Sequence, residues 1–292
     1  MPELPEVETV RARLEPVLSG RRLERVEISD ARLTRPFDPV VVAAELQGER
    51  VESVGRRGKY LVVRFESGRV LLVHLRMTGS FHVAPAGALP DDPHRRAAIT
   101  LDDGSDVGYR DLRRFGTWLL LEPNETEPYL AARVGEEPLE QGFSARELVT
   151  KLSRRRAPVK AVLLDQRVFA GMGNIYADEA LWRARIHPLR PANEVTEDEV
   201  RRLHRSVREA LRMGISRQGS TLSTYRLPDG SRGSMQHEFK VYGRAGDPCD
   251  RCGTPIEKSR VAGRGTSYCP ECQPYAASGA SSPALSRRQS SV

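Results

Sequence analysis

The sequence has few cysteines, no long apolar run and no secretory pattern. Each of these features excludes a class of protein. All four cysteines of the 292 residues lie between positions 249 and 272, so the rest of the chain folds without disulfide bonds. No apolar stretch reaches the roughly eighteen residues that a membrane-spanning helix needs. The first residues lack the basic-then-apolar order of a signal peptide. We therefore expect a cytoplasmic protein with no membrane partner.

The composition suits two soluble domains with a basic surface. Hydrophobic residues make up 39% of the chain and charged residues 29%, which is enough for ordinary cores. Lys and Arg number 46 against 39 Asp and Glu, and the excess is uneven. Residues 151–160 carry five basic side chains and no acid. Such a run favours a polyanionic partner, and a solvated helix face is the alternative.

The first residues combine a nucleophile with an acid. If Met1 is removed, which the small residue behind it permits, Pro2 becomes the N-terminus and offers a secondary amine beside Glu3. An α-amino group titrates near ~8, so part of it is unprotonated at neutral pH. Such an amine can attack a sugar C1′ to form a covalent iminium, while a carboxylate moves the protons. The alternative is that Pro and Glu simply open a helix.

A helix is predicted directly after this pair. From residue 3 to residue 18 the apolar positions recur at steps of three and four, which indicates one buried face, and Gly20 ends it. This helix would hold Pro2 in place. The apolar positions are Leu4, Val7, Val10, Leu14 and Val17.

Short strands follow, and they predict an N-terminal β-sandwich or flattened barrel of about eight strands over residues 1–125. Turn signals separate them, and Asp102-Asp103-Gly104 suits a tight hairpin. Residues 84–95 read as an exposed loop. The strands that the pattern identifies are residues 25–28, 60–65, 70–75, 98–101, 107–109 and 117–121.

Helices dominate the second half, so the fold class is α+β. Residues 122–138 read as a connecting segment, and we assign a linker to residues 126–140. A helical domain then spans residues 141–235. Capping-box sequences at Ser144 and Thr196 open two of its helices, and the second keeps helical spacing until Gly214.

Between these two helices the sequence predicts a helix-two-turns-helix motif. Residues 160–166 form the first helix, and the second starts after two glycine-bearing turns with Asn174 as its cap. Gly171 and Gly173 let the backbone approach a ligand closely, and a helix start presents free N–H groups. The motif therefore suits a phosphate group, and a plain helix-helix connection is the alternative.

The cysteines predict one structural zinc ion. Cys249-x2-Cys252 and Cys269-x2-Cys272 use every cysteine at the spacing of a tetrahedral site, and two disulfides are the alternative that a cytosolic chain disfavours. Four thiolates leave no open position for catalysis. We expect a finger over residues 236–273, with Arg260, Arg264 and Tyr268 near the tip of its hairpin, and a disordered Ser/Ala-rich tail over residues 274–292.

Six motifs in register resemble one family. They are PELPEVET at residues 2–9, GKY at 58–60, HLRMTG at 74–79, RRFG at 113–116, GNIY at 173–176 and the four-cysteine finger. In this order they resemble the bacterial formamidopyrimidine-DNA glycosylases, over residues 2 to about 273. The resemblance implies a monomeric repair enzyme that binds damaged double-stranded DNA, needs no small-molecule cofactor and flips the damaged nucleotide out.

The resemblance also implies a reaction and roles for particular residues. Pro2 attacks C1′, an oxidised purine such as 8-oxoguanine or a formamidopyrimidine departs, and β- and δ-elimination cut the strand. Glu3 matches the family's acid, Lys59 the lysine of β-elimination, and Arg264 the finger arginine of δ-elimination. Further family carboxylates, whose roles are less settled, match Glu6, Glu137 and Glu179.

Other matches concern DNA contacts. Met77, Arg113 and Phe115 suit filling the hole that a flipped base leaves, although singly each also suits a core or surface role. The segment 219–238 corresponds to the family's damaged-base loop. Candidates for binding the DNA backbone are His74, His94, Arg113, Arg155 and Asn174.

Two departures and two rival functions remain open. Leu112 stands where the family usually has proline, and Arg76 where it often has glycine, so adjusted DNA contacts are expected. An endonuclease VIII type enzyme for oxidised pyrimidines shares this scaffold, but Leu4 and the long 219–238 segment favour the purine enzyme. A non-catalytic DNA-binding protein is the second rival, and intact Pro2, Glu3 and Lys59 argue against it.

Overall fold

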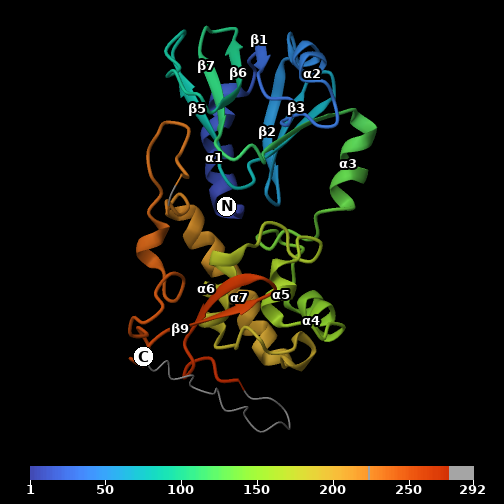
Figure 1. Cartoon of the computed structure of the whole chain (residues 1–292). Helices are drawn as coiled ribbons and strands as arrows, with labels where there is room; N and C mark the ends of the chain where they lie inside the picture. Colours follow the sequence, from blue (N-terminus) through green and yellow to red (C-terminus); the bar gives the residue numbers. More distant parts are fainter. Residues whose placement is uncertain (223, 276–292) are drawn as a thin grey trace, which may run out of the picture.

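The computed structural model describes residues 1–222 and 224–275. Figure 1 shows a β-rich half above a helical half, with the N-terminus lying between them. The predicted disordered tail falls mostly on residues 276–292, which lie outside the described residues. In the described part, no helix is both long enough and apolar enough to cross a membrane.

Helix α1 (Leu4–Leu18) joins the two halves. Its apolar face is buried as predicted, and Gly20 follows the helix at φ +77°, a conformation that favours glycine. Leu4 packs in the core of the helical half, whereas Val7 and the later apolar residues of α1 pack in the core of the sandwich. The N-terminus is therefore held at the junction of two cores.

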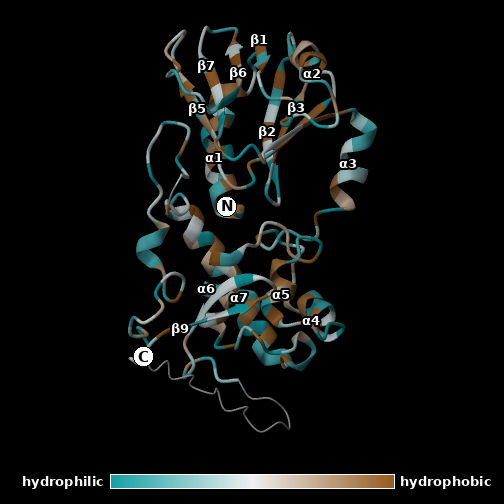
Figure 2. Cartoon of the chain, in the orientation of Figure 1, coloured by the Kyte–Doolittle hydropathy of each residue, from teal (hydrophilic) through white to brown (hydrophobic). Residues whose placement is uncertain are grey.

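The N-terminal half is a sandwich of two four-stranded antiparallel sheets, in agreement with the predicted eight strands. One sheet has the order β1-β6-β7-β5 and the other β2-β3-β4-β8. Apolar side chains from both sheets form one buried core, and Figure 2 shows hydrophobic residues along the strands. The strands are β1 (Leu23–Ile28), β2 (Val51–Arg57), β3 (Tyr60–Phe65), β4 (Val70–His74), β5 (Gly79–Ala84), β6 (Arg95–Leu101), β7 (Asp106–Asp111) and β8 (Thr117–Leu121).

The sequence pattern missed β2 and β5, because both contain glycine and several polar or charged residues. It also missed α2 (Pro39–Leu46), which Asp38 caps through its side chain.

The interpretation of residues 122–138 as a connecting segment was wrong in part. Helix α3 (Pro123–Ala131) lies there, because Pro123 occupies the first helical turn, where proline is favoured, and Glu122 forms a capping box with Glu125.

The C-terminal half packs its helices around one core, and the finger adds a hairpin. The elements are α4 (Ala145–Ser153), α5 (Val159–Leu164), α6 (Asn174–Ala184), η1 (Ala192–Glu194), α7 (Glu197–Ser216), η2 (Met235–Glu238), β9 (Glu257–Val261) and β10 (Arg264–Tyr268). Both predicted capping boxes, at Ser144 and Thr196, are present.

Two predicted helix boundaries were wrong. Helix α7 runs through Gly214 to Ser216. Gly214 does not end the helix but makes room for Tyr176, because a Cβ at this position would lie 2.5 Å from the Tyr176 ring. Asn174 is the first residue of α6 and not its cap, which is Gly173. Both glycines therefore serve close packing.

Candidate active site

The carboxylate of Glu3 lies against the start of helix α6. It accepts hydrogen bonds from the backbone N–H of Ile175 at 2.9 Å and of Tyr176 at 3.3 Å. A Cβ at Gly173 would lie 2.2 Å from Glu3 Cδ, so glycine is needed for this approach. Burial raises the pKa of Glu3, although Lys59 and the two N–H groups oppose that shift. The Glu3 carboxyl is therefore buried and held in one position.

Glu6 ties three parts of the chain together beneath this group. Its carboxylate accepts hydrogen bonds from the N–H of Glu3 at 2.9 Å, the hydroxyl of Tyr176 at 2.8 Å and the N–H of Ser220 at 2.8 Å. Burial and the charge of Glu3 raise its pKa to about 7. Glu6 therefore positions the N-terminal turn, helix α6 and the segment 219–238 relative to one another.

Pro2 is buried and lines a small cavity of about 50 Å³. Met77 and Thr78 from the sandwich, Ile175 from α6 and Tyr225 from the segment 219–238 also line this cavity. Met1 stands at the rim and is 42% exposed. Removal of Met1 would enlarge the cavity and open it at the proline nitrogen.

Lys59 enters the same site from the turn between β2 and β3. It is buried, and burial lowers the pKa of its ammonium group, while the charges of Glu3 and Glu6 oppose that shift. The turn is held from the helical side, because the Gly58 N–H donates to the carboxylate of Glu137. Arg56 donates to the same carboxylate at 2.9 Å. Glu137 is therefore a support for the lysine turn.

A buried ion pair fastens the finger hairpin to the helical half. Lys160 Nζ lies 2.6 Å from Asp178 Oδ1 and donates to Thr266 Oγ1 at 2.7 Å. Asn174 Nδ2 donates to the Gly265 carbonyl at 2.9 Å. These contacts hold the residue next to Arg264, and the positive charge of Arg264 helps to lower the pKa values of Lys59 and Lys160. Arg264 thus belongs to the same charged cluster as Glu3 and Lys59.

Glu179 anchors the segment that leads into the finger. Its buried carboxylate accepts hydrogen bonds from three consecutive backbone N–H groups, those of Lys240, Val241 and Tyr242, at 2.9 to 3.1 Å. Arg183 donates to its other oxygen at 2.8 Å. Glu179 therefore holds the residues that precede the finger, and it does not line the Pro2 cavity.

The predicted void-filling residues come from two loops of the sandwich. Thr78, next to Met77, accepts a hydrogen bond from the Arg113 N–H at 3.0 Å, which brings the loops together. The Arg113 guanidinium lies over the ring of Phe115, 4.8 Å from its centroid, and Phe115 is 52% exposed. An exposed aromatic ring capped by a cation suits insertion into a base stack.

The two residues that depart from the family pattern lie near these loops. Arg76 is exposed and has φ +52°, in the left-handed region that favours glycine. Leu112 is 44% exposed, and its loop is held by Arg114, which donates to the carboxylate of Asp30 at 2.6 and 2.8 Å.

The remaining candidates for phosphate binding are more dispersed. His74 ends β4 inside the site, where its Nδ1 accepts the Arg76 N–H at 3.0 Å, and burial and nearby cations lower its pKa to about 3. His94 lies before β6 at 3.3 Å from the Arg96 guanidinium. Arg155 follows α4 and donates to the Lys151 carbonyl at 2.7 Å. His94 and Arg155 therefore lie outside the cluster around Glu3.

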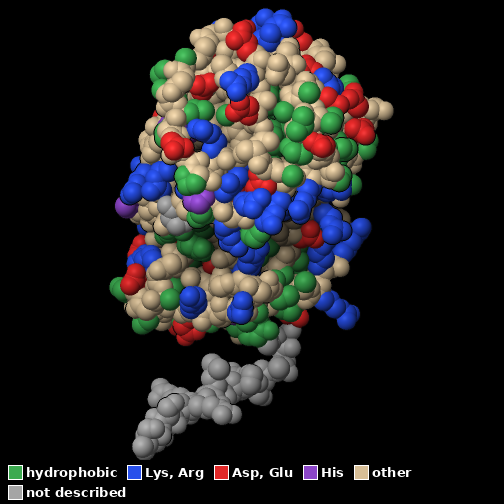
Figure 3. Space-filling view, turned by 45° about the horizontal axis from the view of Figure 1, so that its top comes forward, with side chains coloured by type: hydrophobic (Ala, Val, Ile, Leu, Met, Phe, Trp, Pro, Cys, Tyr) green, Lys and Arg blue, Asp and Glu red, His purple; other side chains and the backbone are tan. Residues whose placement is uncertain are grey.

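Lys and Arg side chains gather in a band across the middle of the face shown in Figure 3, between the two halves of the molecule. Histidine side chains lie in the same band. A cationic band that crosses the junction suits a long polyanion better than a small ligand.

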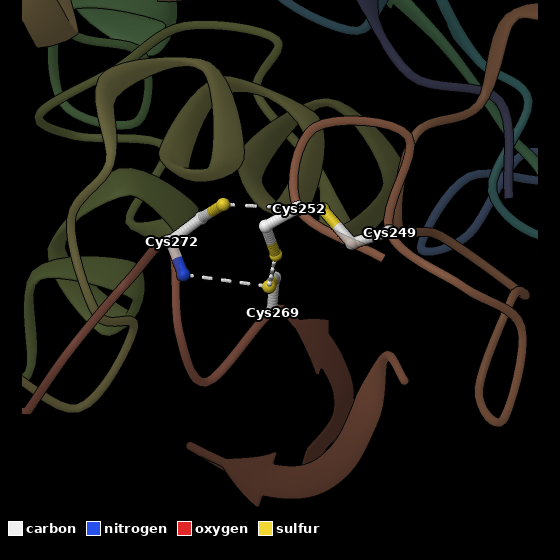
Figure 4. A group of neighbouring side chains, drawn as sticks. All are labelled: Cys249, Cys252, Cys269 and Cys272. Carbon is white, nitrogen blue, oxygen red and sulfur yellow. Dashed lines mark hydrogen bonds between the residues drawn. The ribbon is translucent and has the colours of Figure 1, made fainter. Parts of the chain in front are cut away.

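The four cysteines form one cluster, as predicted. Their Sγ atoms lie within 4.8 Å of one another, and they come from the two ends of the β9–β10 hairpin (Figure 4). Cys249 also accepts a hydrogen bond from the Trp182 indole at 3.4 Å, which attaches the cluster to α6. Four thiolates at this separation fit one tetrahedral zinc ion. The finger holds one structural zinc, and its closed ligand set leaves the metal no role in the reaction.

Comparison with known families identifies the scaffold. The family model described as the Formamidopyrimidine-DNA glycosylase N-terminal domain matches residues 1–118, and that of the H2TH domain matches residues 134–226. A zinc finger found in FPG and IleRS matches residues 246–274. This chain belongs to the formamidopyrimidine-DNA glycosylase family.

Two curated members of the family illustrate the likeness. The formamidopyrimidine-DNA glycosylase of Symbiobacterium thermophilum is 47% identical over 98% of this chain and 94% of its own length. That of Geobacillus kaustophilus is 45% identical over 94% of this chain and its whole length. The family assignment therefore rests on nearly complete chains.

Solved structures of the family share the fold. A mutant Lactococcus lactis FPG in complex with Fapy-dG containing DNA has a TM-score of 0.88, at 38% identity, and the match covers 94% of this chain and 100% of that chain. The MutM (FPG) protein of Thermus thermophilus has a TM-score of 0.83, at 45% identity, over 93% and 98% of the two chains. The predicted fold class is confirmed.

The sequence pattern missed several groups that position the site. The sequence pattern assigned the free N–H groups at the start of this helix to a phosphate, whereas the Glu3 carboxylate accepts those of Ile175 and Tyr176. The Asp178–Lys160 pair gave no signal, because a lone Asp on a helix is common. Lys160 lay within the basic run, but its burial could not be seen there. Gly173 gave the available signal, since a glycine before a helix marks a close approach.

Proposed function

We propose that this protein removes oxidised and ring-opened purine bases from duplex DNA and then cleaves the strand at the abasic site. The single observation that carries the proposal is the place of Pro2, buried beside the Glu3 carboxyl at the start of α6 and on the wall of a cavity. In this proposal residues 1–125 supply the nucleophile and acid, residues 141–273 grip the duplex, and the protein acts as a monomer in the cytoplasm.

The first step uses the N-terminal pair. After loss of Met1, the nitrogen of Pro2 attacks C1′ of the damaged nucleoside, and the bond from C1′ to the base breaks as the base takes a proton. The proline nitrogen loses its own proton, and the C1′–O4′ bond then opens with a proton going to O4′, which leaves a covalent iminium between C1′ and the nitrogen. The raised pKa of Glu3 supports its role, because it favours the protonated carboxyl that a proton donor requires when the base or sugar oxygen departs. Every group needed for this step comes from the protein chain.

The second step is strand cleavage. Loss of a C2′ proton from the iminium expels the 3′ phosphate, and a second elimination expels the 5′ phosphate. Arg264 supplies positive charge at this place, and burial lowers the pKa of Lys59, which favours the neutral amine that a base requires. The ion pair Lys160–Asp178 supports the second elimination by holding the hairpin that carries Arg264.

The remaining residues hold the DNA. The cationic band between the halves suits the phosphate backbone. In this proposal His74, His94, Arg155 and Asn174 contribute further backbone contacts. Met77, Arg113 and Phe115 fill the stack after the damaged nucleotide has left it. The segment 219–238 covers the extruded base, because Ser220 and Tyr225 already border the Pro2 cavity.

Activity on oxidised pyrimidines is the second candidate. One structural neighbour, the wild-type Lactococcus lactis FPG at 37% identity, is in complex with DNA that contains an oxidised pyrimidine. Single-turnover excision rates decide between the two activities. They are measured on duplexes with 8-oxoguanine opposite each normal base and on a duplex with thymine glycol. Faster excision of thymine glycol would reverse the order of the candidates.

Borohydride trapping on a duplex with an abasic site tests the covalent step. The wild-type protein is expected to give a stable protein–DNA adduct, and Pro2→Gly is expected to lose most of it because the secondary amine is gone. Mass spectrometry of the purified protein must show that Met1 has been removed. If protein without Met1 still binds the duplex but forms no adduct, the proposed reaction is wrong. The protein would then be a DNA-binding protein that is not catalytic.

A further inference from the structure

A second cavity, of about 420 Å³, lies beside the β5–β7 pair, and neither Pro2 nor Glu3 lines it. Three parts of the chain form its walls: the strands themselves, the loop between β5 and β6, and residues 224–230. Cavities of this size hold small molecules in proteins, where the range is about 300–1,000 Å³. The site is therefore large enough for a ligand of its own.

The hollow exists because a side chain is missing from the outer face of the sheet. Gly108 on β7 pairs with His82 on β5, and Phe81, the neighbour of His82, is buried on the inner face. Side chains alternate along a strand, so Gly108 and His82 face outward. Leu89 from the loop covers the glycine, and a Cβ there would lie 3.1 Å from Leu89 Cδ2.

The walls of this cavity are held by contacts of their own. Arg95 donates to the Pro90 carbonyl at 3.0 Å, which fixes the loop. The Val83 N–H donates to the Pro228 carbonyl at 3.0 Å, and Leu227 is 1% exposed in the sandwich core. The cavity is therefore preformed, which spares a ligand the cost of ordering the walls.

The lining combines apolar surface with an excess of positive charge. Leu89 and Pro90 offer apolar surface, and the guanidinium groups of Arg95 and Arg110 stand against one carboxylate. That carboxylate, of Asp92, is already paired with Arg110 at 2.7 Å. A ligand with a flat apolar ring and one acidic group matches this lining.

We propose that this cavity binds a small aromatic anion, which then contacts residues 224–230 of the segment 219–238. Thr224 lines both this cavity and the small cavity beside Pro2, so the segment separates the two sites. The binding itself is independent of the reaction proposed above.

Fluorescence titration of the full-length protein with 8-anilinonaphthalene-1-sulfonate, an aromatic ring system with one sulfonate, tests the site. One equivalent is expected to bind. Arg110→Gln should weaken binding about tenfold, because a hydrogen bond to a charged group is lost. His82→Trp should abolish binding by filling the hollow. Arg64→Gln, at an exposed arginine of β3 in the other sheet, is the matched control and should change nothing.

Hydrogen exchange of the same variants locates the probe. Slower exchange in β5 and in residues 224–230 is expected when the probe is bound, and unfolding curves confirm that each variant is folded. Unchanged binding by both His82→Trp and Arg110→Gln, or protection confined to other segments, would overturn the proposal. So would competitive displacement of the probe by undamaged duplex, which would make this surface part of the DNA interface.

Discussion

The Glu3 carboxylate accepts the backbone N–H of Ile175 at 2.9 Å across 172 residues of sequence. The bond joins the first turn of α1 to the first turn of α6, so the acid and the helix start are placed by each other. The positive end of the α6 dipole favours the ionised carboxylate, whereas burial favours the neutral one, and burial prevails.

The first prediction concerns the close approach of Gly173 to Glu3. Gly173→Ala adds a Cβ 2.2 Å from Glu3 Cδ, far inside contact distance, so Glu3 must move. We expect a loss of about 1–3 kcal/mol in the free energy of unfolding and slower base release in single-turnover assays. Gly142→Ala, which meets no atom within 4 Å, is the control. Equal behaviour of the two variants would mean that the contact does not position the acid.

The second prediction separates the acidity of Glu3 from its hydrogen bonds. Glu3→Gln keeps the volume and an oxygen that can accept the Ile175 N–H, so the fold should persist. Base release should fall by roughly 10²–10⁴-fold, the usual contribution of a general acid. Glu15→Gln on the same helix is the control, and rapid-quench kinetics is the measurement. A rate within about threefold of wild type would remove Glu3 from the chemistry.

The third prediction uses the pKa of His74, which burial, Arg76 and Lys59 lower to about 3. An unfolded histidine titrates near ~6.5. Between these values the unfolded chain binds more protons than the folded chain, so stability falls as the pH decreases. His74→Asn retains an acceptor for the Arg76 N–H but has no titrating ring. Its stability should therefore fall less steeply, by up to about 1.4 kcal/mol per pH unit.

Urea unfolding of wild type and His74→Asn between pH 7 and pH 5 measures this difference. His237→Asn, at an exposed histidine, is the control. Parallel curves for wild type and His74→Asn would show that His74 is protonated normally in the folded protein.

The fourth prediction concerns removal of zinc. The protein has two tryptophans, of which Trp118 lies in the sandwich core and Trp182 packs beside Cys249. Chelation should change the fluorescence of Trp182 alone, abolish DNA binding and leave the sandwich folded, because the finger depends on the metal. Variants that keep only one tryptophan, Trp182→Phe and Trp118→Phe, separate the signals. Full DNA binding by protein verified as zinc-free would exclude the finger from the interface.

The fifth prediction follows from the cationic band. Binding to undamaged duplex should weaken steeply as salt rises, because each neutralised phosphate releases a counterion. The slope of log K against log salt should become less steep by about 1 when one phosphate-binding residue is replaced, and Arg155→Gln tests this. Arg25→Gln, on an exposed side chain of β1, is the control. A flat salt dependence of the wild type would contradict the phosphate assignments.

Local patterns in the sequence determined much of this protein. The spacing of the cysteines predicts their cluster, because four ligands from two knuckles need only a short hairpin between them. The period of residues 3–18 predicts α1, and the short runs of strand-forming residues at 60–65 and 117–121 predict β3 and β8 to the residue. Each of these features depends on neighbours along the chain, which the sequence displays directly.

Only the tertiary structure decided how distant residues meet. Glu6 holds Tyr176 and Ser220, and Lys160 is buried against Asp178 and Thr266, although nothing in those stretches marks them as partners. The sequence pattern also read Gly214 as a helix end, whereas packing against Tyr176 requires it inside α7. Burial and long-range contact set the pKa values of the site, and these arise only when the two cores close around the N-terminus.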